Sequence, residues 1–308
     1  MKEVIFQQLI YKDDLYYNQD ENKPFTGVAF EPNITDNPLD LSKKISTRTF
    51  LDGKLDGLST WFSPTGDPRL RMEFKKGEVS GLCEQFRFIG NGTYVLQKLI
   101  YKDGELDGVC KWYSTEGRLM KKETYKKGLL HGPRVNYYNY YHKGHRIKKI
   151  GNFYNGVPDG EWETYNAVGR LERTGQYKKG RRHGLWEWFY QDSQPMENIT
   201  YNWGKKHGPI ACFFRNFRNE DQSPTIQTKG INLNNKREGI WERFHPNGKI
   251  LCRATYANGV ITEWEWFDAS GKKKEFLIPH SNIRRPYLEG DPLLFSVNGD
   301  PLLCDIPF

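Results

Sequence analysis

The sequence of 308 residues lacks the features of a membrane-spanning or secreted protein. No apolar stretch approaches the roughly 18 residues that a transmembrane helix requires. The N-terminus has neither the apolar core of a signal peptide nor the Arg-rich amphipathic pattern of a transit peptide. We therefore expect a soluble protein of the cytoplasm.

Cysteine is scarce and scattered. The five cysteines are Cys83, Cys110, Cys212, Cys252 and Cys304, and none belongs to a Cys-x-x-Cys pair. An odd, dispersed set of this kind predicts neither a disulfide framework nor a zinc site. We expect reduced thiols, in agreement with a cytoplasmic location.

Sequence motifs of the common enzyme classes are also missing. There is no Gly-x-Ser-x-Gly nucleophile motif, no phosphate-binding P-loop, no His-Glu-x-x-His zinc motif and no dinucleotide-binding glycine pattern. We therefore expect no catalytic residues, no cofactor and no metal site. An enzyme is the least expected class of protein.

Helical periodicity is absent as well, since no window shows sustained apolar residues at i, i+3, i+4 and i+7. The chain is nevertheless not that of a disordered protein, because aromatic residues make up 15% of it. These two observations together predict a folded protein with few helices.

Glycine is abundant, with 30 residues, and its positions repeat. Gly-x-x-x-Gly pairs begin at Gly53, Gly77, Gly104, Gly128, Gly156, Gly180 and Gly204, and incomplete copies begin at Asn235 and Gly259. Successive copies are 24 to 31 residues apart, and 24 is the commonest spacing. Internal repetition at such a period indicates a repeat architecture in which each copy contacts its neighbours.

Aromatic residues recur in step with these glycines. Three residues before the first glycine stand Phe50, Phe74, Tyr101, Tyr125, Phe153, Tyr177, Tyr201 and Tyr256. Five residues after the second glycine, at position +5, stand Phe62, Phe86, Tyr113, Tyr137, Tyr165, Phe189, Phe213 and Phe244. Positions are counted below from the second glycine of each pair.

Each repeat contains two short extended runs separated by a turn signal. That signal is Thr65-Gly66, Glu116-Gly117, Val168-Gly169, Asn247-Gly248 or Ser270-Gly271. Such dipeptides between aromatic and β-branched runs form hairpin turns, because Gly and Asn tolerate positive φ. We predict an all-β fold: an elongated, single-layer antiparallel meander of about nine hairpins, twisted or gutter-shaped. The array covers residues 27–276, after N-terminal capping strands in 1–26 and before a C-terminal tail in 277–308.

The glycine pairs, the aromatic positions and the Asn-Gly turns resemble the MORN repeat, in its 24-residue bacterial variant. The stretch Tyr16-Tyr17 followed by Lys23–Val28 resembles the opening repeat of bacterial MORN proteins described as antitoxin-like. The resemblance implies an array of β-hairpins that acts as a scaffold binding proteins or membrane surfaces.

Alternation along each strand divides the repeat positions between two faces. We call the face with positions +1, +3 and +5 the odd face, and the face with +2 and +4 the even face. The odd face carries the apolar +1 and the aromatic +5 residues, and we expect it to be buried. The even face carries most of the tryptophans, and the candidate protein-binding residues on it are Trp61, Trp112, Arg134, Trp162, Trp186, Trp188, Trp241 and Arg243. Either this face packs inside a curled sheet or it receives a partner, since Trp and Arg are enriched at binding hot spots.

Positive charge is concentrated in residues 118–182, which hold sixteen Lys and Arg against five acidic residues. The candidate anion-binding residues are Lys121, Lys122, Lys126, Lys127, Lys143, Arg146, Lys148, Lys149, Lys178, Lys179, Arg181 and Arg182. Three interpretations of this charge are open. In the first, the residues keep the strand ends soluble; in the second, they bind an acidic protein; in the third, they bind nucleic acid or anionic lipid.

Two further features complete the sequence. His131, His183 and His207 precede the second glycine, where other repeats have Asp or Glu, which predicts a side chain that hydrogen-bonds within a turn. The tail repeats Gly-Asp-Pro-Leu-Leu at residues 290–294 and 299–303, which indicates either a cap on the last hairpin or a peptide that docks on a partner.

The sequence as a whole predicts a non-catalytic protein-binding scaffold that neutralises or organises a protein partner, or serves as a subunit of a larger assembly. The alternative is a binder of anionic surfaces, nucleic acid or acidic lipid, through residues 118–182.

Overall fold

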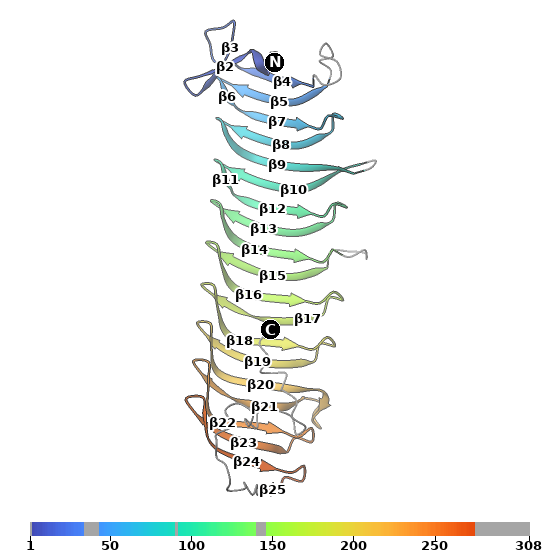
Figure 1. The fold of residues 1–308 in the computed structure, drawn as a ribbon, viewed down its shortest axis with the longest axis vertical. Helices are drawn as coiled ribbons and strands as arrows, with labels where there is room; N and C mark the ends of the chain where they lie inside the picture. Colours follow the sequence, from blue (N-terminus) through green and yellow to red (C-terminus); the bar gives the residue numbers. More distant parts are fainter. Residues whose placement is uncertain (1, 34–42, 90–91, 140–145, 275–308) are drawn as a thin grey trace, which may run out of the picture. The chain divides into compact units, whose positions relative to one another are not determined.

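The computed structural model describes residues 2–33, 43–89, 92–139 and 146–274. The predicted C-terminal tail, Lys143 and Cys304 lie outside these residues. The chain divides into two units, residues 1–157 and 158–308, which are described separately. Figure 1 shows that in each unit the strands follow one another in sequence order.

The first unit consists of strands and one short 3-10 turn. Its elements are β1 (Glu3–Ile5), η1 (Phe6–Gln8), β2 (Leu9–Lys12), β3 (Leu15–Asn18), β4 (Gly27–Pro32), β5 (Lys44–Leu51), β6 (Lys54–Leu55), β7 (Gly57–Phe62), β8 (Pro68–Lys75), β9 (Glu78–Ile89), β10 (Gly92–Lys102), β11 (Glu105–Leu106), β12 (Gly108–Tyr113), β13 (Leu119–Lys126), β14 (Leu129–Tyr137) and β15 (Ile147–Tyr154). Strand β1 pairs with β4 in parallel, β2 and β3 form a separate antiparallel pair, and the later strands pair antiparallel with their sequence neighbours.

The second unit repeats the same antiparallel pairing. Its strands are β16 (Val157–Tyr165), β17 (Leu171–Lys178), β18 (Arg181–Phe189), β19 (Pro195–Asn202), β20 (Lys205–Arg218), β21 (Pro224–Leu233), β22 (Lys236–Phe244), β23 (Ile250–Ala257), β24 (Val260–Phe267) and β25 (Lys273–Lys274). The predicted all-β meander of hairpins is therefore confirmed. No helix in the described part of the chain is long and apolar enough to cross a bilayer.

The Gly-x-x-x-Gly segments form the tight turns between hairpins, as predicted. Lys76 and Gly77 have φ angles of 53° and 92°, and the same pair of positive angles recurs at Lys127-Gly128. Two successive positive φ angles define the type I′ turn, whose twist matches that of the flanking strands. Glycine is required at the second position because its φ lies where a Cβ is strained.

Hydrogen bonds join each tight turn to the one before it. The amide of Gly77 donates to the carbonyl of Leu55 at 2.7 Å, and the amide of Gly204 donates to the carbonyl of Arg182 at 2.8 Å. A side chain adds a second link, since the Asp56 carboxylate accepts from the Lys76 amide at 3.0 Å. The predicted hydrogen-bonding role of the residue before the second glycine is confirmed here.

The assignment of the buried face was wrong. At +1 on the odd face, Leu58, Leu185 and Ile240 are 50%, 50% and 57% exposed, whereas Cys110 at +2 on the even face is fully buried. The physical reason is that, in the described part of the chain, each strand mainly contacts the strands hydrogen-bonded to it within the sheet. Burial therefore comes from large side chains that cover one another on a single face, and aromatic rings achieve this better than isolated aliphatic residues.

Candidate interaction surfaces

The even face of the second unit is packed by its tryptophans. Trp162, Trp186 and Trp241, all at position +2, are 6%, 2% and 3% exposed. Each ring lies against the tyrosine three residues before the next first glycine. The ring centroids are 5.6 Å apart for Trp162 and Tyr177 and 6.2 Å apart for Trp241 and Tyr256, with edge-to-face geometry. This is the favourable arrangement of two aromatic quadrupoles.

Two glycines make room for these rings. A Cβ placed on Gly175 would overlap the indole of Trp186, and one placed on Gly230 would overlap the indole of Trp241. The close approach also satisfies the indole nitrogens. Trp186 Nε1 donates to the carbonyl of Gln176 at 2.9 Å, and Trp241 Nε1 donates to the carbonyl of Ile231 at 3.0 Å.

An arginine covers each of these two tryptophans. The guanidinium carbon of Arg182 lies 4.8 Å from the ring centre of Trp186, and that of Arg237 lies 4.6 Å from the ring centre of Trp241. Each arginine also donates to a tyrosine hydroxyl, at 3.1 Å for Arg182 and 2.8 Å for Arg237. Arg182, predicted from the sequence to bind anions, therefore makes an intramolecular cation–π contact.

The remaining predicted protein-binding residues differ in exposure. Trp61, Trp112, Trp188 and Arg134 are half-buried, and Arg243 is buried. In the first unit the Lys121 ammonium lies 3.9 Å from the ring centre of Trp112. The structure thus places these residues on one face within each unit and engages several of them in contacts with their own chain.

Glu123 is the most deeply buried carboxylate of the first unit among the described residues, at 3% exposure. It is neutralised by Lys121 at 3.0 Å and Arg134 at 3.1 Å, and it accepts a hydrogen bond from the Tyr125 hydroxyl at 2.8 Å. Burial and this hydrogen bond raise the pKa of Tyr125 above its ordinary value. A buried charge requires such partners, so this cluster accounts for two predicted site residues, Lys121 and Arg134, as part of the internal structure.

The odd face of the second unit carries a row of exposed apolar side chains. We call Leu185, Pro209, Ile231 and Ile240 the aliphatic row. Pro209 pairs directly with Ile231, and Ile231 and Ile240 are 53% and 57% exposed. Its members come from β18, β20, β21 and β22 of one sheet, and β19 lies between the first two strands, with Thr200 opposite Leu185. Sequence reasoning noted the apolar +1 positions but assigned them to the core.

Charged residues lie beside the aliphatic row. Glu242 accepts hydrogen bonds from Arg253 at 2.7 Å and pairs with Lys229 at 3.2 Å. Burial alone would raise the pKa of Glu242, but the hydrogen bonds from Arg253 and Lys229 outweigh burial and hold the pKa below its ordinary value of 4.5. The odd face therefore combines an apolar centre with a charged border.

The predicted anion-binding residues of the first unit do not form one patch. Lys126 and Lys127 lie at a tight turn, whereas Arg146 and Lys148 lie at the opposite, loop end of the hairpin. The intervening strand β14 of nine residues spans roughly 30 Å at about 3.3 Å per residue. Lys122 points to the odd face, because it pairs with Lys111 at +3, and Lys149 points to the even face, because it pairs with Asn136 at +4.

The candidate anion-binding residues of the second unit lie at its tight turns. Lys178, Lys179 and Arg181 are exposed at the turn between β17 and β18. Trp203, which sequence reasoning did not single out, is 42% exposed at the next tight turn. The signal for it was a tryptophan at the turn position where other repeats have Asp, Asn or Lys.

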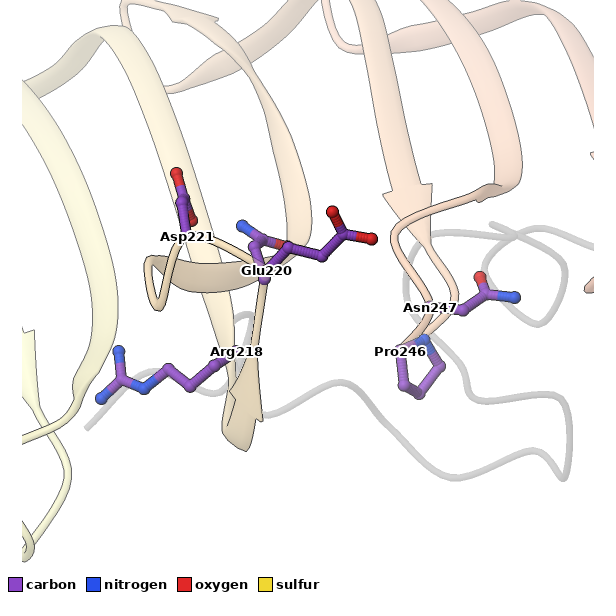
Figure 2. Close-up of a pocket in the computed structure, with 6 residues that line it drawn as sticks. Arg218, Glu220, Asp221, Pro246 and Asn247 are labelled. Carbon is purple, nitrogen blue, oxygen red and sulfur yellow. The ribbon is translucent and has the colours of Figure 1, made fainter.

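Shallow hollows occur at two places in the described part of the second unit. One lies between two hairpin loops and is lined by Arg218, Asn219, Glu220, Asp221, Pro246 and Asn247. Figure 2 shows Glu220 directed toward the loop of Asn247, while Arg218 and Asp221 point away from it. The other lies on the odd face beside Glu242 and Phe244. Among the residues that the structure describes, no three His, Cys, Asp or Glu side chains are grouped to hold a metal ion.

The chain was compared with curated proteins and with solved structures. No curated protein matches the chain. A solved structure titled "Crystal Structure of TcdB2-TccC3-Cdc42" is similar over 78% of this chain and 13% of that chain, at 10% sequence identity and a TM-score of 0.17. The chain thus spans about an eighth of that structure's length, and a TM-score this low establishes no common fold.

The family comparison matches individual repeats. The model of the MORN repeat variant matches residues 106–127, 182–202 and 237–258. Each matched segment begins two residues before a second glycine and continues to the next tight turn, so each covers one repeat. Three repeats of this chain are therefore similar to the MORN repeat variant.

Proposed function

We infer that the chain is a non-catalytic scaffold that binds a protein partner through the aliphatic row of its second unit. The observation that carries this inference is the exposure of Leu185, Ile231 and Ile240, each at least half exposed on the odd face of the same sheet. Repeats of the MORN type are generally associated with binding and scaffold roles.

The chemistry of the odd face suits a protein interface. Its apolar centre at Ile231 and Ile240 is bordered two residues away by Lys229 on β21 and Glu242 on β22. Protein interfaces combine an apolar, desolvated centre with a polar rim in the same way. Exposed apolar side chains grouped on one face are also unfavourable in water, and such a group is typical of a binding surface.

Two finer features belong to the same proposal. The partner is a single protein that the scaffold neutralises or organises, as the antitoxin-like resemblance suggests. The site of action is the cytoplasm, which is supported by the buried thiols of Cys83 and Cys110, because a reducing compartment keeps thiols out of disulfides.

Affinity purification with two variants tests this proposal. Ile231→Glu combined with Ile240→Glu introduces charge in the centre of the row, and we expect loss of a stoichiometric protein partner. Val260→Glu is the matched control, since Val260 is 66% exposed at a tight turn away from the row, and it should retain the partner. Retention of the partner by the double variant, with its far-UV spectrum unchanged, contradicts the proposal.

A further inference from the structure

Three successive tight turns of the second unit form an edge with strong positive charge, whereas the following turn at Asn258-Gly259 has no charged residue. The three segments 178–183, 202–207 and 233–238 hold eight Lys and Arg against one acidic residue, Glu238. The corresponding segments of the first unit, 51–56, 75–80, 102–107 and 126–131, hold six Lys against six Asp and Glu. The counted turns are therefore neutral in the first unit and cationic in the second.

Backbone hydrogen bonds hold the three cationic turns in a fixed row. The amide of Gly204 donates to the carbonyl of Arg182, and the amide of Asn235 donates to the carbonyl of Lys206, both at 2.8 Å. The aliphatic stem of Arg181 also packs over Gly204, where its Cβ lies 3.7 Å from the position of a glycine Cβ. Successive turns are two strands apart, about 10 Å, so the row extends roughly 20 Å.

Most of these cations have no anionic partner within the protein. In the described part of the chain, no ion pair or side-chain hydrogen bond engages Lys178, Lys179, Arg181, Lys205 or Lys236. Arg182 and Arg237 are instead held on tryptophans, as described above. Free cations in a row at this spacing repel one another, and an anionic ligand relieves the repulsion.

An exposed aromatic ring lies in the middle of this row. Trp203 has a φ of 50°, which is unusual for a large side chain, at a turn position where other repeats have Asp, Asn or Lys. The His183 ring lies 5.8 Å from it, between ring centres, and the Lys178 ammonium lies 5.6 Å from its centre. A flat ring beside cations is the arrangement that stacks an unpaired base while neighbouring cations contact phosphates.

We propose that this edge, which we call the cationic edge (residues 178–183, 202–207 and 233–238), binds single-stranded nucleic acid, with one base stacked on Trp203. A linear polyanion matches a linear row of cations, and an unpaired base matches the exposed ring. The surface is distinct from the aliphatic row, so a protein partner and a nucleic acid occupy different parts of the second unit.

Fluorescence anisotropy of the full chain with labelled (dT)15 and (rU)15 tests the proposal. We expect binding that weakens steeply between 50 and 200 mM salt, with a slope of about +3.5 in log Kd against log salt if five phosphates are contacted. Lys178→Glu with Lys179→Glu should weaken binding at least tenfold. The matched control, Lys126→Glu with Lys127→Glu, makes the same change in the same Lys-Lys-Gly turn of the first unit and should weaken it less than twofold.

Trp203→Asn separates stacking from charge. Asn favours the positive φ of this turn, so the variant should fold, and loss of one stacked base should weaken binding about tenfold without changing the salt slope. Equal losses in the two Lys pairs, or no loss in Trp203→Asn, would overturn the proposal. Binding to vesicles containing phosphatidylserine or to poly-Glu, with none to either oligonucleotide, would also overturn it and would assign the edge to a membrane or an acidic protein.

Discussion

The indole ring of Trp186 lies directly over the backbone of Gly175, on the neighbouring strand of the second unit. The same relationship joins Trp241 to Gly230, so it is a property of the repeat and not of one site. In both cases the missing Cβ allows the ring to approach the strand and its Nε1 to reach a backbone carbonyl. The even face is thereby closed by the protein's own rings.

Gly175→Ala should destabilise the second unit. The new methyl group would overlap the ring of Trp186, and overpacking of this kind costs about 1–3 kcal/mol. Urea unfolding measures the change. The cost should be smaller in a Trp186→Leu background, because the overlapping ring is absent, and equal costs in the two backgrounds would show that the ring is not the cause.

Arg237 should stabilise the fold through Trp241 and Tyr256. Arg237→Ala removes both the cation–π contact and the hydrogen bond to the tyrosine hydroxyl, and we expect a loss of roughly 1–2 kcal/mol in the free energy of unfolding. Tyr256→Phe removes only the hydrogen bond and should cost about 1 kcal/mol or less. A double-mutant cycle between the two positions should give a positive coupling energy, and full additivity would contradict the contact.

Lys76→Asn should stabilise the first unit. Lys76 occupies the first position of a type I′ turn with a φ of 53°, and Asn followed by Gly77 is the preferred sequence for that turn. We expect a gain of about 0.5 kcal/mol, since Asn tolerates the left-handed region better than Lys. Thermal unfolding measures it, and an unchanged or lower melting temperature would contradict the turn assignment.

Stability of the second unit should fall in acid partly because of Glu242. Its pKa is held below 4.5 in the folded state, so its contribution is present above pH 4.5 and is lost as the pH falls through the lower folded value. Glu242→Gln should reduce stability at pH 6 and flatten the pH dependence below 4.5. The control Glu220→Gln, at an exposed loop, should leave the profile unchanged, and a Glu242→Gln profile as steep as the wild type's would contradict this.

Much of the fold was predictable from the sequence because its signals are local. The glycine pairs have to be where φ is positive, as at Gly77, and the aromatic spacing reports strand alternation directly. Trp203 was missed because only one repeat has Trp at this turn position. The positions shared by all repeats give no sign of a residue that occurs in one of them.

The choice of buried face was not predictable in the same way. Alternation shows which residues share a face, but it does not show which face is covered. Val109 and Leu185 are apolar and 39% and 50% exposed, while Ser59 is polar and fully buried. Whether a side chain is covered depends on its cross-strand neighbours. Those neighbours are set by the strand register, which is a property of the assembled sheet.

Thiol labelling of single-cysteine positions tests the assignment of the two faces most directly. In a Cys304→Ser background, maleimide should react rapidly with Leu185→Cys and Ile240→Cys on the odd face, at the rate of an exposed thiol. The native Cys110 and Cys252 on the even face, both fully buried, should react only after denaturant is added. Rapid native-state labelling of Cys110 or Cys252, with protection of the two introduced thiols, would contradict the account.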